Sequence, residues 1–235
     1  MDTRNAASFR GPGKPAEKFG RVIGKKREHF PDRGSAHWER ELRQLMGLFR
    51  ATIQHRRNVR LLISGVAPFD EWNDIWSDYF ISVQEIRIGH FDRDTSIELL
   101  TRPTPDFPRD AISLELAEKI FERTGGLPHL LQLYGSVLIN LLNNEGKKRK
   151  HASMSDFDAV EETVLEKGGN YFNYIVKNAP QAAREILMGL SRGGQVQLRD
   201  IKPKTRRWLA HRCLITDDGQ LTIPVLARWI REEWE

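Results

Sequence analysis

The sequence predicts a mainly α protein in which a short α/β segment precedes a helical region and a C-terminal winged-helix unit. Three patterns lead to this prediction. A short apolar run over residues 59–63 is typical of a buried strand. Apolar residues then recur at helical spacing through most of residues 92–178. Finally, Asp218 and Gly219 lie between two alternating segments, a strong signal for a β-hairpin.

Composition limits the class of protein. The chain has 235 residues, of which 39% are hydrophobic, enough for a packed core. No stretch approaches the ~20 apolar residues of a membrane span, and the polar start does not resemble a secretion signal. The single cysteine, Cys213, excludes an intramolecular disulfide, and the seven scattered histidines show no ligand spacing. We therefore expect a cytoplasmic protein with no metal and no membrane partner.

Residues 1–37 are expected to form a basic, irregular N-terminal segment. The net charge of +5 arises within residues 1–33, which hold nine Lys/Arg and four Asp/Glu, whereas the remainder holds 28 of each. Such an arm can bind nucleic acid by neutralising phosphates. Its many glycines and prolines are equally typical of a solvated tail.

Residues 38–91 predict a partial α/β core. Apolar residues at three- and four-residue steps indicate a helix over residues 38–55. A buried strand over residues 59–65, an aromatic helix over residues 70–80 and a second strand over residues 83–88 follow. This alternation of helix and strand is typical of a parallel α/β sheet.

Residues 92–178 predict an all-α region of several short helices. The first begins at Asp94 and stops before Pro103. The second has Ser113 as its N-cap and ends at residues 125–126, where two glycines supply a break.

The next two helices of this region differ in polarity. Pro128 opens a helix that is apolar on nearly all sides and should be buried. Ser155 opens another helix, which the glycines at residues 168–169 are expected to interrupt. Glu161 and Glu162 are adjacent on that helix, so their side chains diverge and are expected to face solvent.

Residues 179–235 predict the winged-helix unit. Helices over residues 182–190 and 205–212 precede a hairpin over residues 214–223, and a final helix starts at Pro224. Basic side chains on or beside the second helix could contact DNA phosphates or guanine edges. They are Lys202, Lys204, Arg206, Arg207 and Arg212. The alternative is a winged helix that contacts only its own protein, because nearby acidic residues would repel a duplex.

This order of elements resembles the STAND branch of the AAA+-type P-loop ATPases, including the archaeal-type ATPases, over residues 38–235. The motif that carries the resemblance is Gly-Gly-Leu-Pro at residues 125–128, after a strand that ends at Ser64. The resemblance implies that Ser64, where the family more often has Asn, Thr or Arg, lies beside the γ-phosphate. It also implies that Gly126 and Pro128 belong to the helical lid and contact the nucleotide.

The two motifs that hold the phosphates in that family are missing from this sequence. Residues 20–26 are one residue short of a Walker A loop and have Lys where its hydroxyl residue should be. No apolar run ends in the Asp-Glu pair of a Walker B strand. Because the charge on a transferring phosphoryl group would be unstabilised, we expect no ATP hydrolysis by this chain alone.

Two functions remain open at this stage. The first is the sensor/lid and winged-helix portion of a nucleotide-dependent ATPase switch, in a truncated chain. ATP or ADP would bind only with a P-loop supplied elsewhere, by the missing core, a partner ATPase or an oligomer of the same family. The second is a DNA-binding or adaptor module that acts through the winged helix and the basic segment.

Overall fold

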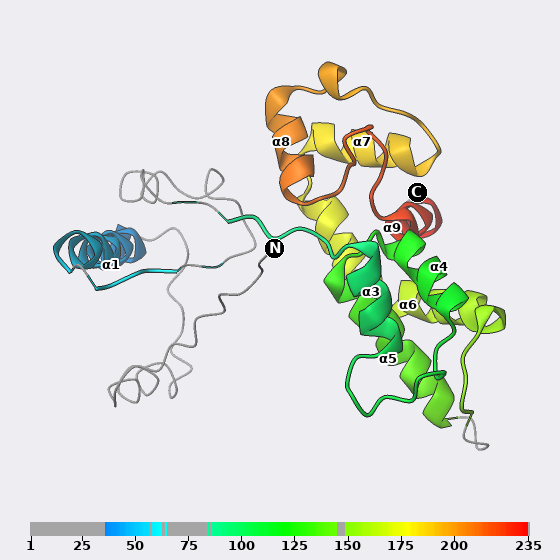
Figure 1. Cartoon of the computed structure of the whole chain (residues 1–235). Coiled ribbons are helices and arrows are strands. Elements are labelled where there is room, and N and C mark those ends of the chain that lie inside the picture. Colours follow the sequence, from blue (N-terminus) through cyan, green and yellow to red (C-terminus); the bar gives the residue numbers. More distant parts are fainter. Residues whose placement is uncertain are drawn as a thin grey trace, which may run out of the picture. The chain divides into compact units, whose positions relative to one another are not determined.

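The computed structural model divides the chain into two units, Met1–Gln84 and Glu85–Glu235 (Figure 1). It describes residues 36–56, 58–62, 64, 84, 86–144 and 149–234. These residues are mainly helical, which confirms the predicted mainly α class. Almost all of the predicted N-terminal segment, and the aromatic helix over residues 70–80, lie outside the described residues.

Helix α1, Ala36–His55, is the one helix described in the first unit, and it matches the helix predicted over residues 38–55. The buried strand predicted over residues 59–65 is not formed in the part of that segment that is described. Leu62 is 85% exposed, and Ser64 is also exposed. A strand is stable only when neighbouring strands pair with its backbone, and the described residues of this unit supply no such strand.

The second predicted strand, over residues 83–88, is also not formed where it is described. Residues 86–91 are irregular, and Ile86 and Ile88 are 71% and 90% exposed. Val83 lies outside the described residues.

Four helices surround the first hydrophobic core of the second unit (Figure 1). They are α3 Arg93–Thr101, α4 Leu114–Thr124, α5 Pro128–Asn144 and α6 Phe157–Asn178. Their inward apolar side chains include Leu116, Ile120 and Leu138, which have no exposed surface. The 3₁₀ turn Met154–Asp156 precedes α6.

Side-chain and glycine caps set the ends of these helices. The Ser113 hydroxyl accepts a hydrogen bond from the backbone N–H of Leu116, as predicted. Helix α3 begins earlier than predicted, because Asp92 Oδ1 accepts from the N–H of Thr95 at 2.7 Å. Before α6, Arg149 forms a two-point ion pair with Asp156 at 2.8 Å.

Helix α6 runs without interruption through Gly168 and Gly169, so the predicted break is wrong. A Cβ atom at Gly168 would lie 2.8 Å from the ring of Phe172 and 3.4 Å from Leu133 of α5. Gly168 therefore makes room chiefly for the ring of Phe172, one turn later on the same helix, while Leu133 lies at an ordinary contact distance. A Cβ atom at Gly169 would only come within 3.7 Å of Trp229.

The second hydrophobic core lies between α6 and the C-terminal elements. These elements are α7 Gln181–Ser191, the 3₁₀ turn Leu198–Asp200, α8 Pro203–His211, α9 Pro224–Trp229 and a π-helical turn Ile230–Trp234. A short hairpin joins α8 to α9 through one antiparallel bridge, Ile215 to Leu221, and Gly219 turns it with φ +74°. The predicted Asp-Gly turn is thus present, although its arms are too short to count as strands.

The adjacent glycines of α6 provide a matched test of this packing. We expect Gly169→Ala to raise the free energy of unfolding by about 0.5–1 kcal/mol, because alanine has the higher helix propensity. Gly168→Ala should lower the free energy of unfolding by about 1 kcal/mol, because the clash of the added methyl group costs more than the higher helix propensity of alanine contributes. Thermal and urea unfolding would measure both. Equal effects at the two positions would contradict the close contact at Gly168.

Candidate functional site

Two glycines form the turn between α4 and α5, here called the glycine turn (residues 125–126). Gly125 ends α4 in the left-handed conformation with φ +57°, and Gly126 follows with φ +75°. The carbonyl of Gly126 accepts a hydrogen bond from the N–H of Phe91 at 2.9 Å, and Nδ1 of His90 donates to the carbonyl of Gly125 at 2.9 Å. Residues 90–91 are thus attached to the glycine turn.

The glycine turn also touches the C-terminal hairpin. A Cβ atom at Gly125 would lie 2.0 Å from the carbonyl oxygen of Thr222, and one at Gly126 would lie 2.1 Å from that of Phe91. These distances are far below van der Waals contact, so both positions require glycine. The turn is therefore held between a segment that precedes α3 and the last residues of the hairpin.

The expected nucleotide-contacting residues occupy different places. Gly126 is buried in the glycine turn, and Pro128 is the half-buried first residue of α5. Ser64 is exposed and belongs to the other unit. Burial lowers the pKa of the neighbouring His90, although its bond to Gly125 acts in the opposite direction.

A buried carboxylate joins four helices beside this turn. Glu161 of α6 accepts hydrogen bonds from Nε of Arg123 at 2.6 Å, from Nη1 of Arg228 at 2.9 Å and from the hydroxyl of Tyr134 at 3.1 Å. Only 5% of its side chain is exposed, so the expectation that Glu161 faces solvent is wrong. Its neighbour Glu162 is exposed, as predicted, and pairs with Arg228.

The ionisation of this cluster follows from its contacts. Burial by itself would raise the pKa of Glu161, but the hydrogen bonds from Arg123 and Arg228 outweigh it and lower that pKa. Burial and the charge of Glu161 together raise the pKa of Tyr134. The cluster thus holds an ionised carboxylate, and its donors lie on α4, α5 and α9.

The position of Glu161 was recoverable from spacing. It lies four residues after Phe157 and four before Leu165, both of which are buried, so helical geometry places it on the inward face of α6. Two adjacent acidic residues suggest a solvated surface. Successive residues of a helix point in different directions, however, so Glu161 faces inward and Glu162 faces solvent.

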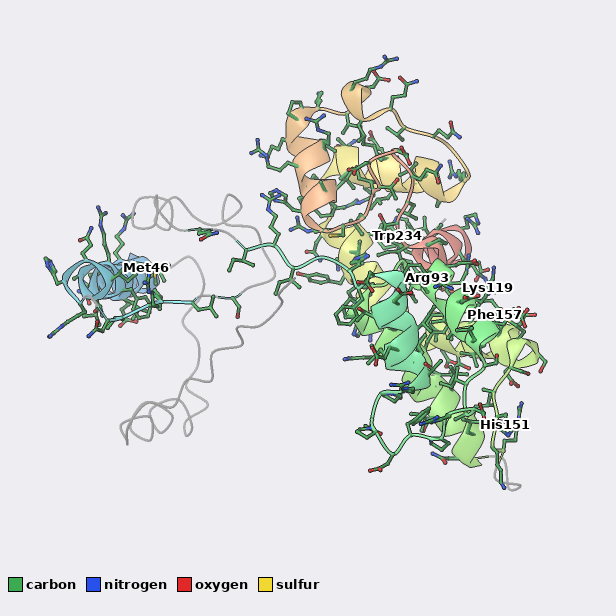
Figure 2. All side chains as sticks on the ribbon, in the orientation of Figure 1. Met46, Arg93, Lys119, His151, Phe157 and Trp234 are labelled. Atoms are coloured by element: carbon green, nitrogen blue, oxygen red, sulfur yellow. The ribbon has the colours of Figure 1, made fainter. Side chains whose placement is uncertain are left out.

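Basic side chains project from α8 into solvent (Figure 2). Lys202 precedes the helix, and Lys204, Arg206 and Arg207 lie on it; all four are exposed. They are the residues predicted to contact nucleic acid. The fifth, Arg212, lies over the ring of Trp208, with 4.3 Å between the guanidinium carbon and the ring centroid.

A cleft of about 460 Å³ opens beside this helix, and we call it the basic cleft. Its charged lining side chains come from three segments: Arg87 before α3, Arg206 and Arg207 on α8, and Asp217 in the hairpin. His211 and Thr216 also line it. Arg87 was not anticipated, because nothing in its local sequence indicates that it lies near α8.

Helix α8 ends in a Schellman motif whose left-handed residue is Cys213, with φ +50°. The N–H of Cys213 donates to the carbonyl of Ala210, and that of Leu214 donates to Leu209, both at 3.0 Å. Glycine usually occupies this position, since it avoids the Cβ penalty. The Cys213 side chain is only partly buried.

Within the described ranges, no group of three or more His, Cys, Asp or Glu side chains is arranged to hold a metal ion. None of the helices described has the length and apolar character needed to cross a membrane. Comparisons with protein-family models, curated proteins and solved structures gave no match.

The Glu161 cluster predicts a dependence of stability on pH. Because the folded-state pKa of Glu161 is lowered, its contribution is fully present above the ordinary glutamate pKa of about 4.3 and is lost as the pH falls through the lower folded value. Glu161→Gln should reduce the free energy of unfolding at pH 7 by about 2–4 kcal/mol, since it removes the carboxylate that pairs with Arg123 and leaves Arg228 with Glu162 and Glu232 alone.

Urea unfolding between about pH 2.5 and about pH 7, a range that spans carboxylate titration, would measure this effect, with Glu162→Gln as the matched control. The Glu161 variant should lose part of the acid dependence seen in the parent chain. The control should change stability by less than about 1 kcal/mol, because its side chain is exposed. Equal losses in the two variants would contradict a special role for the buried carboxylate.

Proposed function

We propose that this chain supplies the sensor/lid and winged-helix portion of a STAND/AAA+-like nucleotide-dependent ATPase switch. The observation that supports this proposal is the position of the glycine turn, which contacts residues 90–91 on one side and Thr222 on the other. In such a switch, a change at the nucleotide must reach the output domain. A lid motif packed directly on the hairpin provides that path.

Two further contacts support transmission between the lid and the C-terminal elements. Helix α6 contributes to both hydrophobic cores, so the two regions share one rigid element. The Glu161 carboxylate also joins Arg123 of α4 to Arg228 of α9. A displacement of α4 would therefore move α9 with it.

Nucleotide binding in this proposal depends on a P-loop from outside this sequence, supplied by the missing core, a partner ATPase or an oligomer of the same family. Gly126 and Pro128 would then contact the nucleotide from the lid, while Ser64 stays a predicted sensor residue of the first unit. No ATP hydrolysis is expected from the chain alone, because a Walker A lysine and the Walker B carboxylates are needed to stabilise the transferring phosphoryl group.

The switch is tested by partner capture in two nucleotide states. The immobilised full chain should retain a P-loop ATPase, identified by mass spectrometry, and should retain several-fold more of it with a slowly hydrolysed ATP analogue than with ADP, or the reverse. Pro128→Ala should weaken this difference while preserving the thermal melt, since alanine is tolerated at the first turn of a helix. Equal retention in both states would contradict the proposal, as would the absence of any P-loop protein.

A second candidate function is binding of nucleic acid through α8. The observation that favours it is the exposure of four basic side chains on, or just before, one short helix: Lys202, Lys204, Arg206 and Arg207. Lysine and arginine side chains that neutralise phosphates release condensed counterions, which provides sequence-independent affinity. The acidic residues of the hairpin, Asp217 and Asp218, would confine a duplex to the α8 side.

Charge reversal on α8 tests this second function. Fluorescence anisotropy with a short labelled duplex should show binding that weakens steeply with salt. Lys204→Glu combined with Arg206→Glu should reduce the affinity at least tenfold, because each loses an attractive contact and adds a repulsive one. Lys167→Glu combined with Lys177→Glu, two exposed positions on α6, makes the same change in net charge and serves as the control. Unchanged binding in the α8 variant would contradict a nucleic-acid role for this helix.

A further inference from the structure

We propose that an apolar groove between α3 and α5 binds an extended, uncharged peptide segment of another protein. This groove, here called the α5 groove, is lined along one wall by side chains from residues 131–140 of α5 and has a volume of about 350 Å³. Helices α3 and α5 lie side by side there (Figure 1). The α5 groove shares no lining residue with the basic cleft or the glycine turn, so the inference does not rest on either proposed function.

The floor of the α5 groove is apolar and firmly packed. Leu100 of α3, Ile112 before α4 and Leu131 of α5 line it, and at most 3% of each is exposed. All three belong to the first hydrophobic core, so the floor does not depend on a ligand for its shape. Among the described residues, no charged side chain lines the groove. A charged ligand would therefore lose hydration there without gaining an ion pair.

Gly135 widens the α5 groove in the middle of its α5 wall. A Cβ atom at this position would come no closer than 3.8 Å to Leu100, which is an ordinary contact distance. Neighbouring side chains therefore do not require a glycine there, although glycine destabilises the interior of a helix relative to alanine. What the glycine provides is open space through which a ligand can approach the helix backbone.

Three polar side chains follow one another along the same wall. Gln132, Ser136 and Asn140 are spaced by four residues, so they lie on one face of α5, about 6 Å apart along its axis. All three are exposed, and their side chains form no hydrogen bond with other described residues. The groove thus combines an apolar floor with one edge of available hydrogen-bonding groups.

This edge matches the backbone of an extended peptide. Peptide groups on one edge of an extended chain recur every two residues, or about 6.7 Å, close to the step between the α5 side chains. The amides of Gln132 and Asn140 each provide a donor and an acceptor, which a peptide group can pair with. Alternate side chains of the peptide would then point to the apolar floor. A bound helix would satisfy its own backbone and leave these amides unpaired.

The test titrates the full chain with uncharged, end-blocked heptapeptides in which serine alternates with leucine, valine or phenylalanine. Nuclear magnetic resonance of the isotope-labelled chain would follow the side-chain amide signals of Gln132 and Asn140, and calorimetry would give the dissociation constants. We expect saturable shifts of both signals with at least one of these peptides. The absence of saturable binding by all three would overturn the site.

Two sets of variants separate the groove from its hydrogen-bonding edge. Gly135→Met should fill the groove and weaken binding about tenfold, whereas the control Gly189→Met, on an exposed site of α7 with no neighbour within 4 Å of an added Cβ, should leave it unchanged. Gln132→Leu combined with Asn140→Leu should also weaken binding about tenfold, because two hydrogen bonds are lost. Both positions are exposed, so this double variant should keep the thermal melt of the parent.

The remaining outcomes would overturn the inference at different points. Unchanged binding by Gly135→Met, or equal weakening by Gly189→Met, would place the peptide elsewhere on the chain. If the double leucine variant binds as tightly as the parent, the groove accepts apolar groups without pairing the backbone, and the extended-peptide assignment fails. A peptide N-methylated at alternate residues checks the same point from the ligand side, since it should bind the parent no better than the unmodified peptide binds the double variant.

Discussion

The fold of the second unit depends on the close approach of two carbonyl oxygens to the glycine turn. Any side chain at Gly125 would meet Thr222, and any side chain at Gly126 would meet Phe91. Left-handed backbone at a residue with a Cβ costs about 1–2 kcal/mol, and the clashes add to that cost. These two glycines are therefore required for three features: the direction of α5 after α4, the attachment of residues 90–91 and the packing of the hairpin against the turn.

The Glu161 cluster adds an electrostatic connection where hydrophobic packing alone would be less specific. A buried carboxylate is costly to desolvate, and it is tolerated here because Arg123, Arg228 and Tyr134 all donate to it. Apolar side chains could fill the same volume with other registers of α6 against α4 and α9. A carboxylate with donors on three helices satisfies its hydrogen bonds in only one of those registers.

Helices were recoverable from the sequence because their signals are local. The caps at Ser113 and Gly125 and the apolar period of α5 predicted them correctly. The two strands were predicted wrongly where they are described, since an apolar run does not reveal whether a pairing strand exists. The two glycines of α6 suggested a break, whereas Gly168 lies within the helix and makes room for the ring of Phe172. The basic residues of α8 were found from sequence, whereas the nearness of Arg87 depends on tertiary contacts.

Cys213 has a consequence for how this protein can be observed. It is the one cysteine in the sequence. It lies between α8 and the hairpin, next to Leu214, whose N–H donates to the carbonyl of Leu209 at the end of the helix. A spin label or fluorophore coupled to its thiol would attach at a single, known position without removal of other cysteines. Because that residue holds a left-handed backbone, the signal would report directly on whether the junction of helix and hairpin stays closed.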